Sequence, residues 1–251
     1  MIDDFKKIIA GFKGKRVLVA GDLMLDEYIW CRSGRISPEA PAPVLDAIKS
    51  ELMPGGSGNT AVNIISLGGI PLPVGVIGRD NAGREVIKAL EHRGVSTSCI
   101  IEDSGRQTTR KTRIIANYRY MARIDSEDRK SLSKKTKEGI VRYLERLIPT
   151  VDAVIISDYR KGFVEEIVAQ AAISLAGKEG IPVCVDSKAV DYSIFRGATV
   201  ITPNNDEAAG AAGNHIRDEE SLIRAGKMLL QAAGVEYVLI KRANKGMTLF
   251  L

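Results

Sequence analysis

The chain of 251 residues is long enough for one large domain or two small ones, and its 45% hydrophobic and 27% charged residues exclude a disordered protein. Its net charge of +5 favours anionic ligands, but the excess is too small to distinguish nucleic acid from phosphorylated small molecules. Three widely spaced cysteines exclude a disulfide framework and favour a reducing, cytoplasmic setting, and no apolar run reaches the roughly 18 residues of a membrane span.

The predicted elements alternate between strands and helices. Short β-branched runs predict buried parallel strands, and segments with a helical apolar period predict helices. Such alternation predicts an α/β fold, with a mostly parallel sheet covered by helices on both faces. In chain order, the predicted strands are 15–20, 74–77, 153–157, 182–185, 198–201 and 237–241, and the predicted helices are 59–67, 82–93, 131–147, 164–176 and 221–233.

Two segments interrupt the alternation. Residues 27–53 and 99–125 have extended patterns without a helical period. We expect them to form a small antiparallel unit, a lid or an oligomer interface, inserted into the core. No linker rich in proline, glycine or serine divides the chain, so residues 1–251 are predicted to form one domain.

Two polar motifs flank the first predicted strand and the first predicted helix. Gly21–Asp26 follows the strand, where an open α/β sheet binds its ligands, and its aspartates can accept hydrogen bonds from sugar hydroxyls. Pro54–Asn59 precedes the helix, so its glycines allow the backbone to approach an oxygen-rich ligand. A turn with Ser57 or Asn59 as the helix cap is an equally good interpretation.

Further polar residues follow later strands. Asn204 and Glu207 open a helix, and an amide with a carboxylate suits water-shelled Mg²⁺, although an N-capped helix is the alternative. Lys111 and Arg113 share one face of an extended strand and can hold a phosphate, unless they belong to a solvated edge strand. Acids and lysines also follow the strands that end near residues 157 and 185, among them Asp158, Lys161, Asp186 and Lys188.

Together these segments resemble the ribokinase-like (PfkB) carbohydrate kinases. Within that family they are closest to the branch that phosphorylates D-glycero-D-manno-heptose 7-phosphate at O1, in ADP-heptose synthesis for lipopolysaccharide. ISPEAP and SDYxKG are specific to that branch, and the resemblance runs from about residue 15 to residue 251. The matching segments are GDLMLD (21–26), RISPEAPAP (35–43), PGGSGN (54–59), KTR (111–113), RID (123–125), SDYRKG (157–162), VDSK (185–188), TPNNDE (202–207) and KRANKGM (241–247).

The resemblance implies a three-layer α/β/α sandwich with a β-sheet lid, and a sugar phosphate and Mg–ATP as ligands. It implies neither a nucleic-acid nor a membrane partner, and it leaves a homodimer through the lid open. The residues implied to bind the sugar are Asp22, Gly55, Gly56, Asn59 and Asp158, with Lys111, Arg113 and Arg123 for its 7-phosphate and Asp125 to fix the lid. Those implied to lie near the nucleotide are Lys188, Asn204, Glu207, Lys241 and Gly246, with Glu207 reaching Mg²⁺ through water.

One part of the family pattern is missing. The catalytic base of these kinases is the Asp of a C-terminal GAGD motif, and this sequence contains no GAGD. We therefore expect a kinase domain that is incomplete at its C-terminus and impaired when tested as this chain alone. No motif assigns the base to Asp158 or Asp186. The alternatives are a non-catalytic sugar-phosphate-binding protein and a kinase of the same family for another sugar.

Overall fold

A computed structural model describes residues 2–251, with side chains from residue 4 onward, and an eight-stranded sheet lies at its centre. The strand order is β12-β11-β10-β9-β8-β1-β4-β5. All neighbouring pairs are parallel except β11 with β12, as the alternation of strands and helices predicts. The strands are β1 (Arg16–Gly21), β4 (Ile70–Gly78), β5 (Ile100–Asp103), β8 (Ala153–Asp158), β9 (Val183–Ser187), β10 (Val200–Ile201), β11 (Tyr237–Lys241) and β12 (Met247–Phe250).

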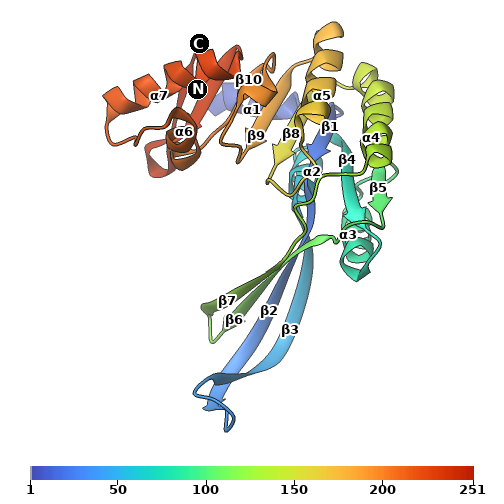
Figure 1. The fold of residues 1–251 in the computed structure, drawn as a ribbon, viewed down its shortest axis with the longest axis vertical. Helices are drawn as coiled ribbons and strands as arrows, with labels where there is room; N and C mark the ends of the chain where they lie inside the picture. Colours follow the sequence, from blue (N-terminus) through green and yellow to red (C-terminus); the bar gives the residue numbers. More distant parts are fainter. Residues whose placement is uncertain (1) are drawn as a thin grey trace.

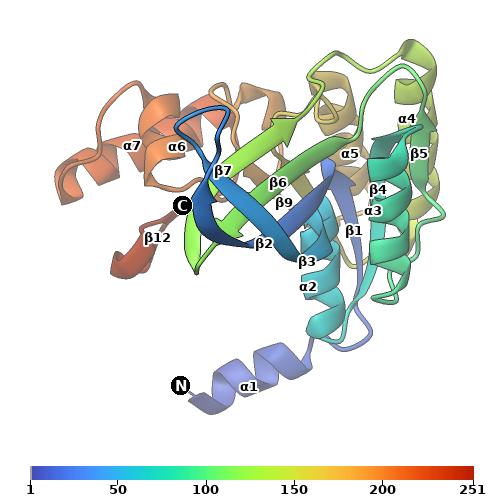
Figure 2. The ribbon, with the colours of Figure 1, turned by 90° about the horizontal axis from the view of Figure 1, so that it is seen from below.

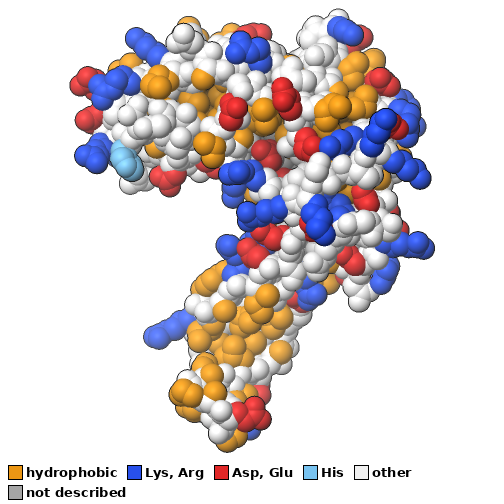
Figure 3. Space-filling view, viewed as in Figure 1, with side chains coloured by type: hydrophobic (Ala, Val, Ile, Leu, Met, Phe, Trp, Pro, Cys, Tyr) orange, Lys and Arg blue, Asp and Glu red, His pale blue; other side chains and the backbone are white. Residues whose placement is uncertain are grey.

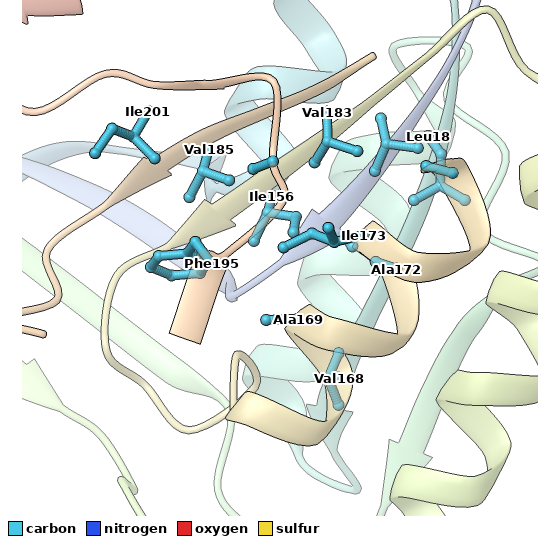
Figure 4. Packing of buried hydrophobic residues seen from close by; sticks show 14 of the residues in the cluster. Leu18, Ile156, Val168, Ala169, Ala172, Ile173, Val183, Val185, Phe195 and Ile201 are labelled. Carbon is cyan, nitrogen blue, oxygen red and sulfur yellow. The ribbon is translucent and has the colours of Figure 1, made fainter. Parts of the chain in front are cut away.

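The main hydrophobic core lies between this sheet and the helices of one face. Helix α5 presents Val168, Ala172 and Ile173 to β8 and β9, and its alanines let it approach the strands closely (Figure 4). Each buried Leu, Ile or Phe side chain contributes roughly 1.5–3 kcal/mol. The helices are α1 (Ile2–Ala10), α2 (Ser57–Ser66), α3 (Asn81–Glu91), α4 (Lys134–Leu147), α5 (Glu166–Lys178), α6 (Asn205–Ala212) and α7 (Glu219–Ala233), with 3₁₀ turns η1 (Ile148–Thr150), η2 (Ser193–Phe195) and η3 (Ala243–Lys245).

The opposite face of the sheet is covered in part by α1 and α2. Strand side chains alternate between faces, so Val17, Ile155 and Cys184 point away from α5. With Ile8 of α1 and Phe12 in the turn after it, they line an apolar groove of about 700 Å³.

A second sheet of four strands, in the order β3-β2-β6-β7, projects from the core as the predicted lid (Figures 1 and 2). The hairpins β2–β3 and β6–β7 are antiparallel, but β2 and β6 pair in parallel, so the lid is mixed rather than wholly antiparallel. Ile101 packs against the main core and β5 pairs with β4, so only the later part of residues 99–125 lies in the lid. The lid strands are β2 (Leu23–Ile36), β3 (Pro43–Gly56), β6 (Thr109–Ala116) and β7 (Arg119–Ser126).

The predicted strands and helices are all present, most of them with shifted ends. Strand β4 begins at Ile70, well before the predicted residue 74, because its prolines do not interrupt the pairing. The N–H of Ile70 donates to the carbonyl oxygen of Lys15, just before β1, and in a strand the N–H groups of successive residues point to opposite sides. Pro71 and Pro73 therefore lack N–H groups on the side away from β1. Strand β5 pairs with β4 only from Gly75 onward, so no hydrogen bond to β5 is lost there. Helix α1 and strand β12 were not predicted.

Candidate functional site

Asp22 holds the loop that follows β8 at the carboxyl edge of the sheet. Its side chain is 3% exposed and accepts the backbone N–H groups of Tyr159 (2.7 Å), Lys161 (3.1 Å) and Phe163 (3.1 Å). Burial raises the pKa of Asp22. The three hydrogen bonds, of which the one from Lys161 has the largest effect, offset only part of this rise. Asp22 is thus a positioning residue for this loop, and its predicted contact with the sugar stays a prediction.

The loop itself has an unusual backbone. Arg160 has φ 56°, a left-handed conformation that few non-glycine residues adopt, and its N–H donates to Asp158 Oδ1 at 2.7 Å. Gly162 has φ 88°, and a Cβ there would lie 2.7 Å from the carbonyl oxygen of Lys130. The loop therefore packs directly against the segment that leaves the lid after β7.

The glycine-rich segment lies against the start of β2. A Cβ on Gly55 would lie 2.4 Å from Asp26 Oδ2, and one on Gly56 would lie 2.3 Å from the carbonyl oxygen of Asp22. Gly56 is the N-cap of α2 and provides no side-chain cap, so the alternative with Ser57 or Asn59 as the cap is wrong. Asn59 is exposed on α2, whereas Ser57 Oγ is buried without a hydrogen-bond partner among the described residues. The first turn of α2 thus has no side-chain cap, and Gly55 just before it lies against Asp26.

The predicted lid cations are separated into two groups. Lys111 Nζ and Arg123 Nε contact Asp125 at 3.2 and 2.8 Å, and hydrogen bonds from both outweigh the effect of burial and lower the pKa of Asp125. Arg113 pairs instead with Asp26 at 2.5 Å. Asp125 therefore joins β6 to β7, while Arg113 lies outside the group.

A polar cavity of about 370 Å³ lies between the lid and the loop after β8, and we call it the cationic pocket. It unites predicted residues from the lid with Lys188, which follows β9 and stacks over the ring of Tyr159 at 5.1 Å. Tyr159, Arg160 and Arg129 are site residues that the sequence did not predict, although Tyr159 and Arg160 lie within SDYRKG. The pocket is lined by Lys111, Arg123, Asp125, Arg129, Tyr159, Arg160, Lys161 and Lys188.

The predicted nucleotide residues lie at the ends of β9, β10 and β11. Asn204 Oδ1 accepts the N–H of Glu207 at 2.9 Å, and Glu207 Oε2 accepts the N–H of Asn204 at 2.8 Å. This reciprocal capping box confirms the structural interpretation of the pair and leaves its Mg²⁺ role a prediction. Lys241 Nζ contacts Asp186 at 2.6 Å, and Gly246 has φ 79° in the turn before β12.

The carboxylates that could act as a base are already engaged. Asp158 accepts a hydrogen bond from Ser187 Oγ at 2.5 Å in addition to that from Arg160 N, and Asp186 accepts from Thr202 Oγ1 at 3.1 Å as well as from Lys241.

Tyr159 lies where these groups converge. Burial is the largest cause of the raised pKa of its hydroxyl, and the negative charges of four carboxylates raise this pKa further. These carboxylates come from Gly21–Asp26, beside the glycine-rich segment, and from the strand ends of the predicted nucleotide site. They are Asp186, Asp26, Glu207 and Asp22.

Among the residues that the structure describes, no three His, Cys, Asp or Glu side chains lie close enough together to hold a metal ion. No helix in the described part of the chain is long and apolar enough to span a membrane.

Comparison with known proteins adds a family and a fold. The family model described as pfkB family carbohydrate kinase matches residues 15–251. The bifunctional protein HldE of Trichlorobacter lovleyi is 43% identical over 235 residues, which cover 94% of this chain and 48% of that protein. The chain thus spans about half the length of the curated relatives it matches.

Solved structures share the fold at low sequence identity. Tetrameric, inhibited phosphofructokinase-2 from Escherichia coli has 17% identity and a TM-score of 0.74, over 94% of this chain and 76% of that one. Arabidopsis thaliana ribokinase, complexed with ribose and ATP, has 18% identity and a TM-score of 0.70, over 95% of this chain and 75% of that one. The architecture is therefore ribokinase-like, as the sequence motifs implied.

Proposed function

We propose that this chain, which belongs to the pfkB family of carbohydrate kinases, serves to phosphorylate O1 of D-glycero-D-manno-heptose 7-phosphate with ATP. The product would be a heptose bisphosphate for ADP-heptose and lipopolysaccharide synthesis. The similarity to HldE over nearly the whole chain and the heptose-branch motifs support this choice of sugar. All three cysteines are free thiols and ATP is a cytoplasmic metabolite, so we also propose a cytoplasmic setting.

The cationic pocket is the observation that carries the proposal. Its cations outnumber its acidic lining residue, Asp125, so it suits a substrate that already bears a phosphate dianion. We propose that Lys111 and Arg123 approach this phosphate from the lid. Arg113, paired with Asp26, would act on the sugar hydroxyls through that carboxylate rather than on the phosphate.

The sugar ring would lie between the pocket and the glycine-rich segment. Gly55 and Gly56 let the chain run close to Asp26, and the uncapped first turn of α2 with buried Ser57 Oγ offers polar groups to hydroxyls. Asp22 would contribute by holding the loop after β8. Asn59 and Asp158 remain proposed sugar-binding residues.

The nucleotide would lie across the ends of β9, β10 and β11. Kinases of this fold use ATP, and we propose Lys188, Lys241, Asn204 and Gly246 as residues that border it. The described residues offer no cage of carboxylates, and Glu207 Oε2 is occupied by the capping box, so the donor set fits Mg²⁺ only in its water shell. When bound, that ion would neutralise charge on the transferred phosphoryl group.

Phosphoryl transfer requires a protein mainly to position the reactants and to stabilise charge. A bond forms between O1 and the γ-phosphorus, the bond from that phosphorus to the bridging oxygen of ADP breaks, and the O1 proton passes to a base. The residues of this chain would position O1 and supply positive charge, from Lys188 above all. We assign the base to none of the described carboxylates.

A binding and turnover experiment tests the proposal. We expect this chain, titrated in a calorimeter, to bind heptose 7-phosphate at least about 10-fold more tightly than unphosphorylated heptose, because charged hydrogen bonds to a phosphate contribute about 1.5–3 kcal/mol. ADP release is then measured on the full-length protein that the gene encodes, with ribose and fructose 6-phosphate as competing sugars. Turnover of either sugar above that of heptose 7-phosphate would assign a different substrate, and absence of turnover with sugar-phosphate binding retained would favour a binding protein.

We also propose that two chains associate through their lids. The lid exposes apolar side chains that a monomer leaves in water, and Figure 3 shows them gathered on its surface. A second lid would cover these side chains and the free edges of the four-stranded sheet. The exposed residues are Ile36, Ile48, Met53, Tyr118, Tyr120, Met121 and Ile124.

A further inference from the structure

We propose that Arg160 selects a phosphorylated sugar by binding its phosphate in the cationic pocket together with the lid cations Lys111 and Arg123. The inference rests on the proposed function and assigns its specificity to a residue at the position that the SDYxKG motif leaves open. Arg160 lines the pocket, follows β8, and faces the lid cations Lys111 and Arg123 across the cavity.

The ion pairs around the pocket leave Arg160 and Lys188 as its two cations without a carboxylate partner among the described residues. Lys111 and Arg123 share Asp125, while Lys161 and Arg129 share Glu127. Within the described part of the chain, neither Arg160 nor Lys188 forms a side-chain ion pair, and Lys188 rests on the ring of Tyr159. Each of the other two pairs of cations shares one carboxylate, whereas Arg160 and Lys188 have none, so Arg160 brings a wholly unpaired charge to a phosphate dianion beside Lys111 and Arg123.

The backbone of Arg160 supports a functional role. Its left-handed conformation at φ 56° favours glycine, yet the position carries a long cationic side chain. The conformation is fixed from both sides, because Asp158 accepts the N–H of Arg160 and Asp22 accepts those of Tyr159 and Lys161. A guanidinium on so constrained a backbone loses less freedom on binding than one on a mobile loop.

Calorimetry on a set of variants tests this assignment. Arg160→Gln removes the charge and keeps the strained backbone, Arg160→Gly removes the charge and relieves the strain, and Arg160→Lys keeps a charge without the bidentate fork. Lys178→Gln, at the exposed end of α5, is the matched control for net charge. Each chain is titrated with heptose 7-phosphate, heptose and Mg–ATP, and its thermal unfolding is recorded.

We expect Arg160→Gln and Arg160→Gly to weaken heptose 7-phosphate binding by about 10- to 100-fold, with heptose and Mg–ATP affinities within about 2-fold of wild type. Arg160→Lys should recover part of the loss, and the control should bind like wild type. An unchanged affinity for heptose 7-phosphate in both charge-removing variants would overturn the assignment. A loss confined to Mg–ATP would also overturn it and assign Arg160 to the nucleotide.

A second set of titrations distinguishes failure of this assignment from failure of the proposed function. If the wild-type chain binds no heptose 7-phosphate, the same variants are titrated with fructose 6-phosphate and inorganic phosphate. A loss of either ligand in Arg160→Gln and Arg160→Gly would support the phosphate role while the heptose assignment fails. Equal binding by all variants would refute both.

Discussion

Asp22 shows how one buried side chain can position a loop that lines a pocket. Its carboxylate accepts three backbone N–H groups of the loop that carries Arg160 and Lys161. Each of those donors would otherwise need water or another partner at the edge of a buried sheet. The position of the cationic pocket therefore depends on a residue that does not line it.

Replacing Asp22 by Ala should loosen this loop. We expect a loss of roughly 2–3 kcal/mol in the free energy of unfolding, because removing one partner leaves buried N–H groups unsatisfied. Hydrogen exchange at Tyr159, Lys161 and Phe163 should accelerate more than exchange elsewhere. Asp191→Ala, which removes an exposed carboxylate that caps Ser193, is the control. Unchanged exchange at the three amides in Asp22→Ala would contradict the anchoring role.

The sequence predicts local features of this site better than distant ones. The Asn204–Glu207 capping box follows from a spacing of three residues, and Lys111 with Arg113 from the two-residue period of a strand. The bond between Asp22 and Tyr159 joins residues 137 apart, and no local pattern encodes such a pair. Arg160 and Arg129 escaped prediction for the same reason, since only the folded chain brings them to the lid.

At the scale of elements, a buried carboxylate joins the strands at the base of the lid. Glu27 of β2 is 7% exposed and accepts hydrogen bonds from Thr112 Oγ1 at 2.7 Å and Arg110 Nη2 at 2.6 Å, both on β6. Burial alone would raise the pKa of Glu27, but these bonds outweigh it and hold the pKa below its ordinary value. The ionised form therefore stabilises the parallel pairing of β2 with β6.

Glu27→Gln should reveal this contribution through its pH dependence. We expect the variant to lose about 1–2 kcal/mol of unfolding free energy at pH 7, a modest value because Arg110 is 43% exposed. The pKa of Glu27 in the folded state lies below its unfolded value near 4.5. The difference in unfolding free energy between wild type and variant should therefore be complete above about pH 4.5 and shrink as the pH falls through the folded-state pKa. Urea unfolding across this range measures it.

Glu85→Gln is the matched control, because the ion pair of Glu85 among the described side chains is with the exposed Lys88 on α3. Its unfolding free energy should stay within about 0.5 kcal/mol of wild type. A Glu27→Gln difference that persists unchanged at acidic pH would show that ionisation of Glu27 does not stabilise the lid.

The four-stranded lid projects from the core and exposes apolar side chains to solvent. Sedimentation equilibrium should show a dimer for the wild-type chain, and Ile124→Asp should shift it to monomer because it places a charge on that surface. Ile223→Asp, which alters an exposed residue of α7 away from the lid, should remain dimeric. A wild-type monomer at all concentrations, or equal dissociation of the two variants, would contradict association through the lid.

The parallel pairing of β2 with β6 has a consequence for how the molecule is assembled. Each hairpin of the lid closes a short loop, whereas the bond from Thr112 to Glu27 closes one of 85 residues, including the whole of β4, α3 and β5. Loop-closure entropy grows with length, so this junction forms at a higher entropic cost than either hairpin. The lid cations reach the loop after β8 only once that junction exists. The cationic pocket, which needs cations from both the lid and the loop after β8, thus depends on a junction between residues far apart in the sequence.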